Sequence, residues 1–301
     1  MNKSDLKPQV RLYSILAREA NRAVVFRRGP SKRVQLIVWH TDTDKFEEGQ
    51  WFKGRIYERR CDLSPSGKLL LYFAAKHKLP YFSWTAVSKP PFLTALAMWP
   101  KGDCWGGGGL FDNERKIRLN HGPHEMALAD DFAVPSRIRV DQVGIHSGGG
   151  EDEPIMGMRL RRDGWKLLQT SEATRRKSGD SVWLEYNPAL VWAKKHGPSK
   201  GRYELQMHIL GLHERDGPWY LIDHVVVDKE NGSNIKLERT DWADWCHSGD
   251  LLFAEKGRLF RLGFSGEGVL NELTSAKLVI DLNDRAFTEL AAPVEAKRWF
   301  P

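Results

Sequence analysis

Apolar residues along this chain come in short runs that Gly, Pro, Asn, Asp or Lys interrupt, and long helical periodicity is scarce. This pattern is typical of strands joined by turns. Two clear hairpins join residues 203–212 with 219–227 and residues 251–254 with 258–262. The pattern therefore predicts an all-β protein.

A few segments need a separate interpretation. Residues 188–195 and 270–276 are compatible with short helical turns, whereas residues 156–161 have the pattern of a strand. The glycine-rich residues 147–153 could divide two domains, but we expect a long surface loop inside one domain. The prediction is thus a single domain that occupies residues 1–301.

One phrase of the sequence occurs twice. It reads Asp-Leu-Ser-Pro-Ser-Gly-Lys-Leu-Leu-Leu-Tyr-Phe from position 62, and it returns in outline from position 244. Aligned without gaps, the identical positions are Asp62 and Asp244, Ser66 and Ser248, Gly67 and Gly249, and the two leucines that follow each. The separation of 182 residues fits four propeller blades of roughly 45 residues. At this pitch the chain would form a β-propeller of six or seven blades, although common turns in a β-sandwich would give a similar pattern.

The phrase resembles the Ser-Pro-Asp-Gly-Lys strand motif of TolB-like and WD-repeat propellers. Ser66 stands where that motif has Asp, and the second copy has Cys246-His247 in place of Ser-Pro. The resemblance implies a turn between the inner strands of a blade, in a bacterial protein with propeller-type repeats. It also implies an interaction platform, because most such propellers bind partners across one face.

Composition limits the classes of function only loosely. The chain of 301 residues has a formal net charge of +7, which favours weak attraction to polyanions without defining a nucleic-acid-binding protein. Cys61, Cys104 and Cys246 are scattered and form no Cys-x-x-Cys pair, so we expect a reducing compartment. Neither a signal peptide nor a membrane-spanning stretch is recognisable, and the expected location is the cytoplasm.

Basic residues gather in short clusters. The first two are Arg27, Arg28, Lys32 and Arg33 in one hairpin, and Arg55, Arg59 and Arg60 just before the first repeat. Two later clusters are residues 159–162 and 175–177. On a shared face they would bind phosphates with a strong dependence on salt. On separate turns they would be ordinary solvated side chains.

Aromatic and histidine residues supply the other candidate binding positions. Trp84 and Phe92 lie in an aromatic, proline-containing segment that could form a binding rim or cover a sheet edge. Trp105 belongs to a glycine-rich run, which lacks the context of a phosphate-binding loop and is better explained by tight bending. His121 and His124 lie on a polar loop, where the sequence identifies no further metal ligand.

These observations favour a non-enzymatic scaffold that binds a protein partner through loops on one face. We predict no catalytic residue, metal site or cofactor. One alternative is a propeller hydrolase of a sugar or lactone, with Asp62, Asp163 and Asp244 converging in a central channel. Another is an accessory nucleic-acid-binding protein that uses the basic clusters.

Overall fold

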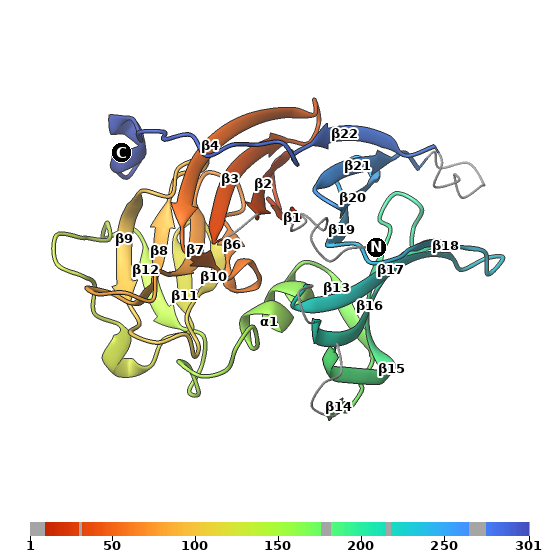
Figure 1. Ribbon diagram of the computed structural model, residues 1–301, viewed down its shortest axis with the longest axis horizontal. Coiled ribbons are helices and arrows are strands. Elements are labelled where there is room, and N and C mark those ends of the chain that lie inside the picture. Colours follow the sequence, from red (N-terminus) through yellow and green to blue (C-terminus); the bar gives the residue numbers. More distant parts are fainter. Residues whose placement is uncertain (1–9, 30–31, 176–181, 215–217, 265–274, 301) are drawn as a thin grey trace, which may run out of the picture. The chain divides into compact units, whose positions relative to one another are not determined.

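The computed structural model describes residues 10–29, 32–175, 182–214, 218–264 and 275–300, and β-strands are the main regular structure in these ranges (Figure 1). Within these ranges α1 (Ile155–Arg162) is the one α-helix. Short 3-10 turns are η1 (Glu58–Arg60), η2 (Pro123–Glu125) and η4 (Val294–Lys297). The prediction of an all-β protein is confirmed. None of the described helices combines the length and the apolar character needed to cross a membrane.

The chain divides into two compact units, and the first contains Met1–Arg159 together with Leu282–Pro301. Its first sheet has the order β1 (Arg11–Leu16), β2 (Arg22–Arg28), β3 (Arg33–His40) and β4 (Lys45–Lys53). Its second sheet contains β5 (Arg55–Ile56), β6 (Asp62–Leu63), β7 (Leu70–Ala75), β8 (Ser83–Ser88) and β9 (Ala95–Pro100). Its third sheet contains β10 (Gly109–Asn113), β11 (Lys116–Leu119) and β12 (Arg139–Gln142), where β11 and β12 run parallel.

The second unit, Leu160–Asp281, contains two further sheets. The fourth sheet has β13 (Trp165–Gln169), β14 (Ala173–Arg175), β15 (Val182–Lys195), β16 (Tyr203–Glu214), β17 (Tyr220–Asp228) and β18 (Asn234–Leu237). The fifth sheet has the order β19 (Trp242–Trp245), β20 (Leu251–Glu255), β21 (Arg258–Leu262) and β22 (Lys277–Asp281). The pairing of strands in both of these sheets is antiparallel.

Successive sheets made of strands that are neighbours in sequence are the organisation of a β-propeller. The described residues form five such sheets, so the estimate of six or seven blades is wrong. That estimate divided the distance between the two repeated phrases by four, whereas the structure places them in the second and fifth sheets, three sheets apart. The sheets also differ in size, since β15 has 14 residues and β11 has four.

The two copies of the repeated phrase form a similar turn. The N–H of Gly67 donates to the carbonyl of Ser64 at 2.8 Å, and the N–H of Gly249 donates to the carbonyl of Cys246 at 2.9 Å. Both glycines have positive φ angles, +74° and +92°. Each turn joins two paired antiparallel strands, β6 to β7 and β19 to β20. The hairpins differ in register by one residue, because Asp62 pairs with Leu71 whereas Asp244 pairs with Leu252, which aligns with Leu70. The repeat therefore marks similar turns in hairpins of different register.

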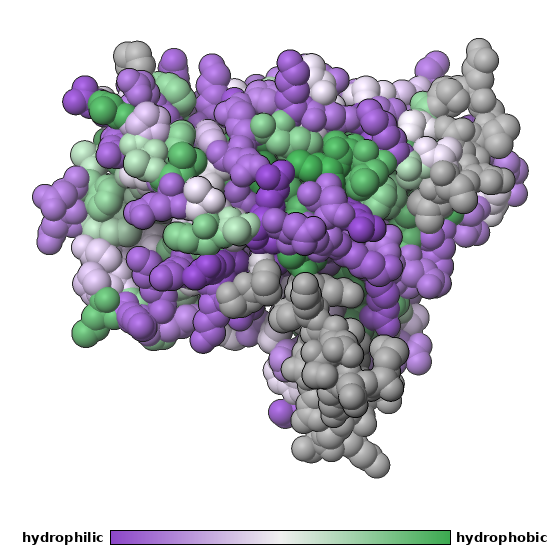
Figure 2. Space-filling view, turned by 45° about the horizontal axis from the view of Figure 1, so that its top comes forward, coloured by the Kyte–Doolittle hydropathy of each residue, from purple (hydrophilic) through white to green (hydrophobic). Residues whose placement is uncertain are grey.

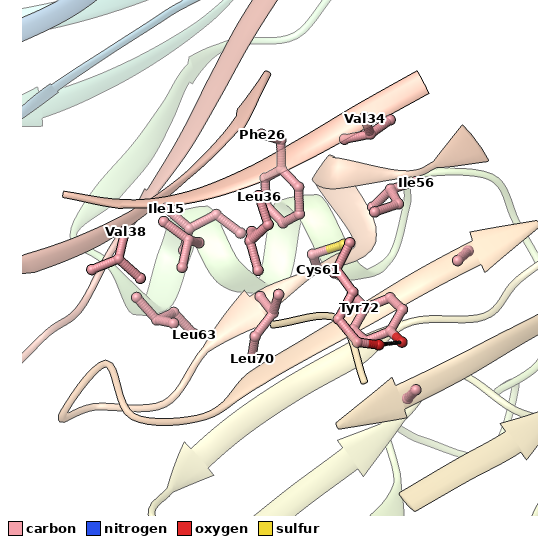
Figure 3. Close-up of a cluster of buried hydrophobic side chains, with 14 of the residues drawn as sticks. Ile15, Phe26, Val34, Leu36, Val38, Ile56, Cys61, Leu63, Leu70 and Tyr72 are labelled. Carbon is pink, nitrogen blue, oxygen red and sulfur yellow. Dashed lines mark hydrogen bonds between the residues drawn. The ribbon is translucent and has the colours of Figure 1, made fainter. Parts of the chain in front are cut away.

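The core of the first unit lies between neighbouring sheets. Phe26 and Leu36 of the first sheet pack toward Leu70 and Tyr72 of the second sheet (Figure 3). The Tyr72 hydroxyl is buried and donates to the carbonyl of Leu93 at 2.6 Å, so its polar atom is satisfied within the core. A large apolar face is thus removed from water between these two sheets.

The opposite face of β7 is also covered. Leu71 belongs to a second cluster with Val87, Trp99 and Phe111, which brings together the second and third sheets. Because successive side chains of a strand point to opposite faces, the continuous apolar run of β7 supplies both clusters. All six residues of β7 are buried as a result.

Residues 282–301 return to the first unit, where Arg27 on β2 holds their first part. Its Nε donates to the carbonyl of Leu282 at 2.8 Å and its Nη2 donates to the carbonyl of Asn283 at 2.9 Å. In Figure 1 this C-terminal segment is drawn in blue and passes beside the red and orange strands of the first sheet. Segments from the two ends of the sequence are therefore joined through one buried guanidinium.

Two local predictions are wrong for identifiable reasons. Residues 188–195 belong to β15, where Pro188 is accommodated in an irregular stretch of pairing between Glu185 and Leu190. Residues 156–161 form part of α1, whose first turn has Pro154 before it and the Glu153 carboxylate accepting from the N–H of Gly157. Most of the segment 270–276 lies outside the described residues.

We predict that Gly107→Ala lowers the free energy of unfolding by about 3 kcal/mol. Gly107 has φ +80°, and an added Cβ would lie 2.3 Å from Cε2 of Phe73, which is fully buried. Gly102→Ala is the matched control, because Gly102 has φ +83° and nothing within 4 Å of an added Cβ. The control should lose only about 1 kcal/mol in denaturant titrations followed by tryptophan fluorescence. Equal losses in both variants would contradict the packing explanation.

Candidate functional site

The first unit contains a cavity of about 640 Å³ with a strongly basic wall. The described residues that line it are Arg28, Lys32, Arg33, Val34, Lys53, Gly54, Arg55, Lys76, His77 and Lys78. Seven of the ten are Lys or Arg, and none is Asp or Glu. Such a wall attracts anions, because its summed potential is positive and low-dielectric surroundings strengthen it.

Three chain segments bring these cations together at the ends of neighbouring strands. Arg33 at the start of β3 pairs with Lys53 at the end of β4. The backbone N–H of Gly54 donates to the carbonyl of Lys32 at 2.9 Å, which holds these two turns side by side. Arg55 on β5 pairs with Ala75 at the end of β7, immediately before residues 76–78. The backbone pairing of two sheets therefore places the basic turns around one space.

Carboxylates do little to balance this charge. Among the described residues, only one cation of the cavity wall forms an ion pair: Arg28 Nη1 lies 3.8 Å from Glu58 Oε2. The Nε of Arg55 is buried and donates to no described group. Four lining lysines, Lys32, Lys53, Lys76 and Lys78, are exposed. An anion in this cavity would meet cations whose hydrogen-bonding capacity is largely unused.

Aromatic rings support several of these cations. The Arg33 guanidinium lies 4.8 Å from the centre of the Phe287 ring, and that of Arg55 lies 4.5 Å from the Tyr57 ring. The His77 ring packs edge to face against Phe82, with their centres 5.0 Å apart. Phe287 and Phe82 are among the exposed large apolar residues, at 42% and 36%. Figure 2 shows hydrophobic areas among hydrophilic ones on one face of the molecule.

The structure separates the first predicted basic cluster into two roles. Arg28, Lys32 and Arg33 line the cavity. Arg27 is fully buried and binds backbone carbonyls, including that of Gly29 at 2.5 Å. Successive residues of a strand point to opposite faces, which explains why Arg27 and Arg28 diverge. Burial also lowers the pKa of Arg27, the expected effect of removing a cation from water.

The second predicted basic cluster is mainly structural. Arg59 is buried and lies 4.9 Å from the centre of the Tyr13 ring. Arg60 is also buried, and its Nε donates to Asp152 Oδ1 at 2.9 Å. Arg55, which precedes them, is the member of this cluster that lines the cavity. Of the later clusters, residues 176 and 177 lie outside the described residues.

The predicted aromatic positions do not gather at one site. Trp84 is half-buried and packs edge to face against Phe52, with ring centres 5.7 Å apart. Phe92 is also half-buried. Trp105 is 58% exposed. Of the glycines that follow it, Gly107 packs against Phe73, whereas Gly106 lies against the backbone of Gly148. None of the three lines the basic cavity.

The two predicted histidines differ sharply in environment. His121 is fully buried, with Nε2 2.8 Å from the Thr85 hydroxyl and Nδ1 3.1 Å from the carbonyl of Glu125. Burial lowers the pKa of His121 to about 4, so the ring is neutral at physiological pH. The side chain of His124 is exposed. No group of three or more metal-ligating side chains occurs in the part of the chain that the structure describes.

The repeated aspartates link neighbouring sheets within their own units. Asp62 is fully buried, and its Oδ2 accepts from the N–H of Phe111 on the third sheet at 2.7 Å. Asp244 Oδ1 accepts from Lys194 Nζ on the fourth sheet, also at 2.7 Å. Burial raises the pKa of Asp244. These contacts give both carboxylates a role in packing.

Several residues of the cavity escaped the sequence prediction, chiefly Lys53, Lys76, His77 and Lys78. They occur in two short basic segments, Lys-Gly-Arg at the junction of β4 and β5 and Lys-His-Lys directly after β7. Basic residues at strand ends could have indicated a shared site, because the strand ends of adjacent sheets can lie close together. Comparison with known protein families finds no family that matches this chain, and comparison with curated proteins finds no match either.

We predict that His121 makes folding sensitive to acid. Because the pKa of His121 is about 4 in the folded chain and about 6.5 in the unfolded chain, the unfolded state binds more protons between these values. Protonation of His121 therefore does not affect the free energy of unfolding above about pH 6.5, and it should lower that free energy by about 3 kcal/mol at pH 4. Denaturant titrations from pH 7 to 4 should show a shallower decline for His121→Gln. The exposed His124→Gln should retain the wild-type slope, and a wild-type slope in both would refute the assignment.

We also predict that Cys104 is the one fast-reacting thiol. All three cysteines are free, but Cys61 and Cys246 are buried, and burial raises the pKa of the Cys61 thiol. Cys104 is half-buried, with Sγ 3.9 Å from His77 Nδ1 at the cavity wall. A disulfide reagent should label one thiol per folded chain, and Cys104→Ser should remove this phase while Cys246→Ser keeps it. Two fast equivalents would contradict the burial pattern.

Proposed function

We propose that this protein is a non-enzymatic binding scaffold of the propeller type, and that it holds an anionic, phosphate-bearing partner in the basic cavity. The single observation that carries the proposal is the wall of seven cations without a lining carboxylate. Arg side chains bind phosphate through paired, charge-assisted hydrogen bonds, and Lys side chains contribute point charges. The cavity offers both kinds of group.

The way the cations are held supports binding over a purely structural role. Arg27, Arg59 and Arg60 show what structural arginines look like in this chain, because each is buried against carbonyls, a carboxylate or a ring. The cavity cations differ, since four are exposed lysines and the Nε of Arg55 donates to no described group. Like charges crowded at one place repel each other, and a bound anion would relieve that repulsion.

The first sequence interpretation, a scaffold for a protein partner, fits this proposal when the partner presents phosphate groups. The hydrolase alternative depended on the repeated aspartates, and the contacts of Asp62 and Asp244 favour a packing role for them. Three free thiols support the proposal of a reducing, cytoplasmic location.

We expect the protein to bind inorganic polyphosphate, with an affinity that falls as salt rises. If about four phosphates are neutralised, the affinity should fall by roughly 10²-fold between 50 and 200 mM salt. Titration calorimetry at several salt concentrations measures this slope. Binding that is absent at low salt would overturn the proposal.

Charge reversal on one strand provides a matched test of the site. Lys53 and Lys45 are exposed residues at opposite ends of β4, and of these two only Lys53 lines the cavity. Lys53→Glu should weaken polyphosphate binding by about tenfold, because it removes one cation and adds a repelling charge. Lys45→Glu makes the same change in net charge and should leave the affinity within about twofold. Equal losses would point to a nonspecific effect of net charge.

A further inference from the structure

Aromatic side chains lie immediately beside the basic cavity, and they specify the ligand further. Phe287 is exposed and carries the Arg33 guanidinium over its ring at 4.8 Å. Phe82 is exposed and contacts His77, which lines the cavity. Each of these two exposed rings therefore contacts a residue that lines the cavity, Arg33 for Phe287 and His77 for Phe82.

Local structure fixes both rings in place. The carbonyl of Phe82 accepts from the backbone N–H groups of Lys76 and His77, each at 3.0 Å, which closes the turn that carries Lys78. Phe287 lies 6.1 Å from the centre of the Trp51 ring on β4. These contacts hold the rings close to the cations while leaving part of each accessible. A flexible loop aromatic would have to be ordered on binding, whereas these rings are already positioned.

We propose that the phosphate-bearing partner is a single-stranded nucleic acid, with its backbone in the cavity and bases stacked on Phe82 and Phe287. This inference rests on the proposed function. Proteins that bind single strands combine a positively charged groove with aromatic side chains that stack on bases. A duplex keeps its base faces inside the stack, so exposed rings beside phosphate-binding cations suit unpaired bases.

The same geometry argues against ligands that offer phosphate alone. Inorganic phosphate or a phosphorylated peptide would use the Lys and Arg side chains but would leave the two exposed phenylalanine rings in water. The Arg33 guanidinium over the Phe287 ring also adds a planar cation, and such a plane can stack on a base. Base stacking tolerates sequence, so we expect weak sequence preference.

The test measures fluorescence anisotropy of a labelled twelve-nucleotide oligothymidine, the corresponding duplex and a phosphorylated peptide. We expect the single strand to bind at least about tenfold more tightly than the duplex. Phe287→Ala and Phe82→Ala should each weaken binding of the single strand by about tenfold, and Phe287→Tyr should restore it. Polyphosphate affinity should stay within about twofold in all three variants, because the cations remain.

Phe300→Ala is the matched control. Phe300 is an exposed phenylalanine of the same unit that lies beneath a cation, Lys89 Nζ at 3.8 Å, yet it does not line the cavity. This variant should bind the oligonucleotide like the wild type. Circular dichroism and the denaturant midpoint confirm that each variant is folded.

The possible outcomes separate the two proposals. Equal affinity for single strand and duplex, tighter binding of the phosphopeptide, or unchanged single-strand affinity in Phe82→Ala and Phe287→Ala would overturn the nucleic-acid inference while polyphosphate still binds. Failure of polyphosphate and oligonucleotide alike to bind at low salt would overturn the proposed function itself.

Discussion

The mutual burial of neighbouring sheet faces is the constraint on which the first unit depends. β7 is buried on both faces, by the first sheet on one side and by the third sheet on the other. Burying a large apolar side chain contributes about 1.5–3 kcal/mol to stability. A sheet that lost its neighbour would expose many such side chains to water and lose these contributions together. The second sheet therefore depends for its stability on the first and third sheets.

Buried polar groups then fix how the sheets meet. Asp62 accepts a hydrogen bond from the third sheet, Arg27 binds carbonyls of the C-terminal segment, and His121 bonds to Thr85 on the second sheet. Apolar packing alone is not directional, whereas an unsatisfied buried polar group is costly. These bonds consequently favour one alignment of the elements. Arg27 and His121, which the sequence suggested as binding residues, instead form these structural hydrogen bonds.

The basic cavity forms at the edge of this packed structure, where strand ends of the first and second sheets meet. No carboxylate lines the cavity, Arg28 is paired with Glu58 at 3.8 Å, and aromatic rings lie against Arg33 and Arg55. Concentrated positive charge of this kind does not stabilise a fold, because the charges repel one another. It is tolerated where side chains reach solvent and is useful where an anion binds. The contrast with the buried arginines separates the two uses of positive charge in one unit.

The sequence by itself determined the all-β class, the main hairpins and the similarity of the turns at Gly67 and Gly249. These follow from local chemistry, since short apolar runs, turn residues and positive φ depend mostly on neighbouring residues. Part of the site was also visible, because Arg28, Lys32 and Arg33 form a basic turn. Tertiary structure alone decided the number of sheets, because the sheets are unequal and no fixed pitch divides the chain. It alone separated Arg27 from Arg28 and brought Lys53, Lys76 and Lys78 to the same cavity, because pleating and contacts between distant strands determine which charges are buried and which meet.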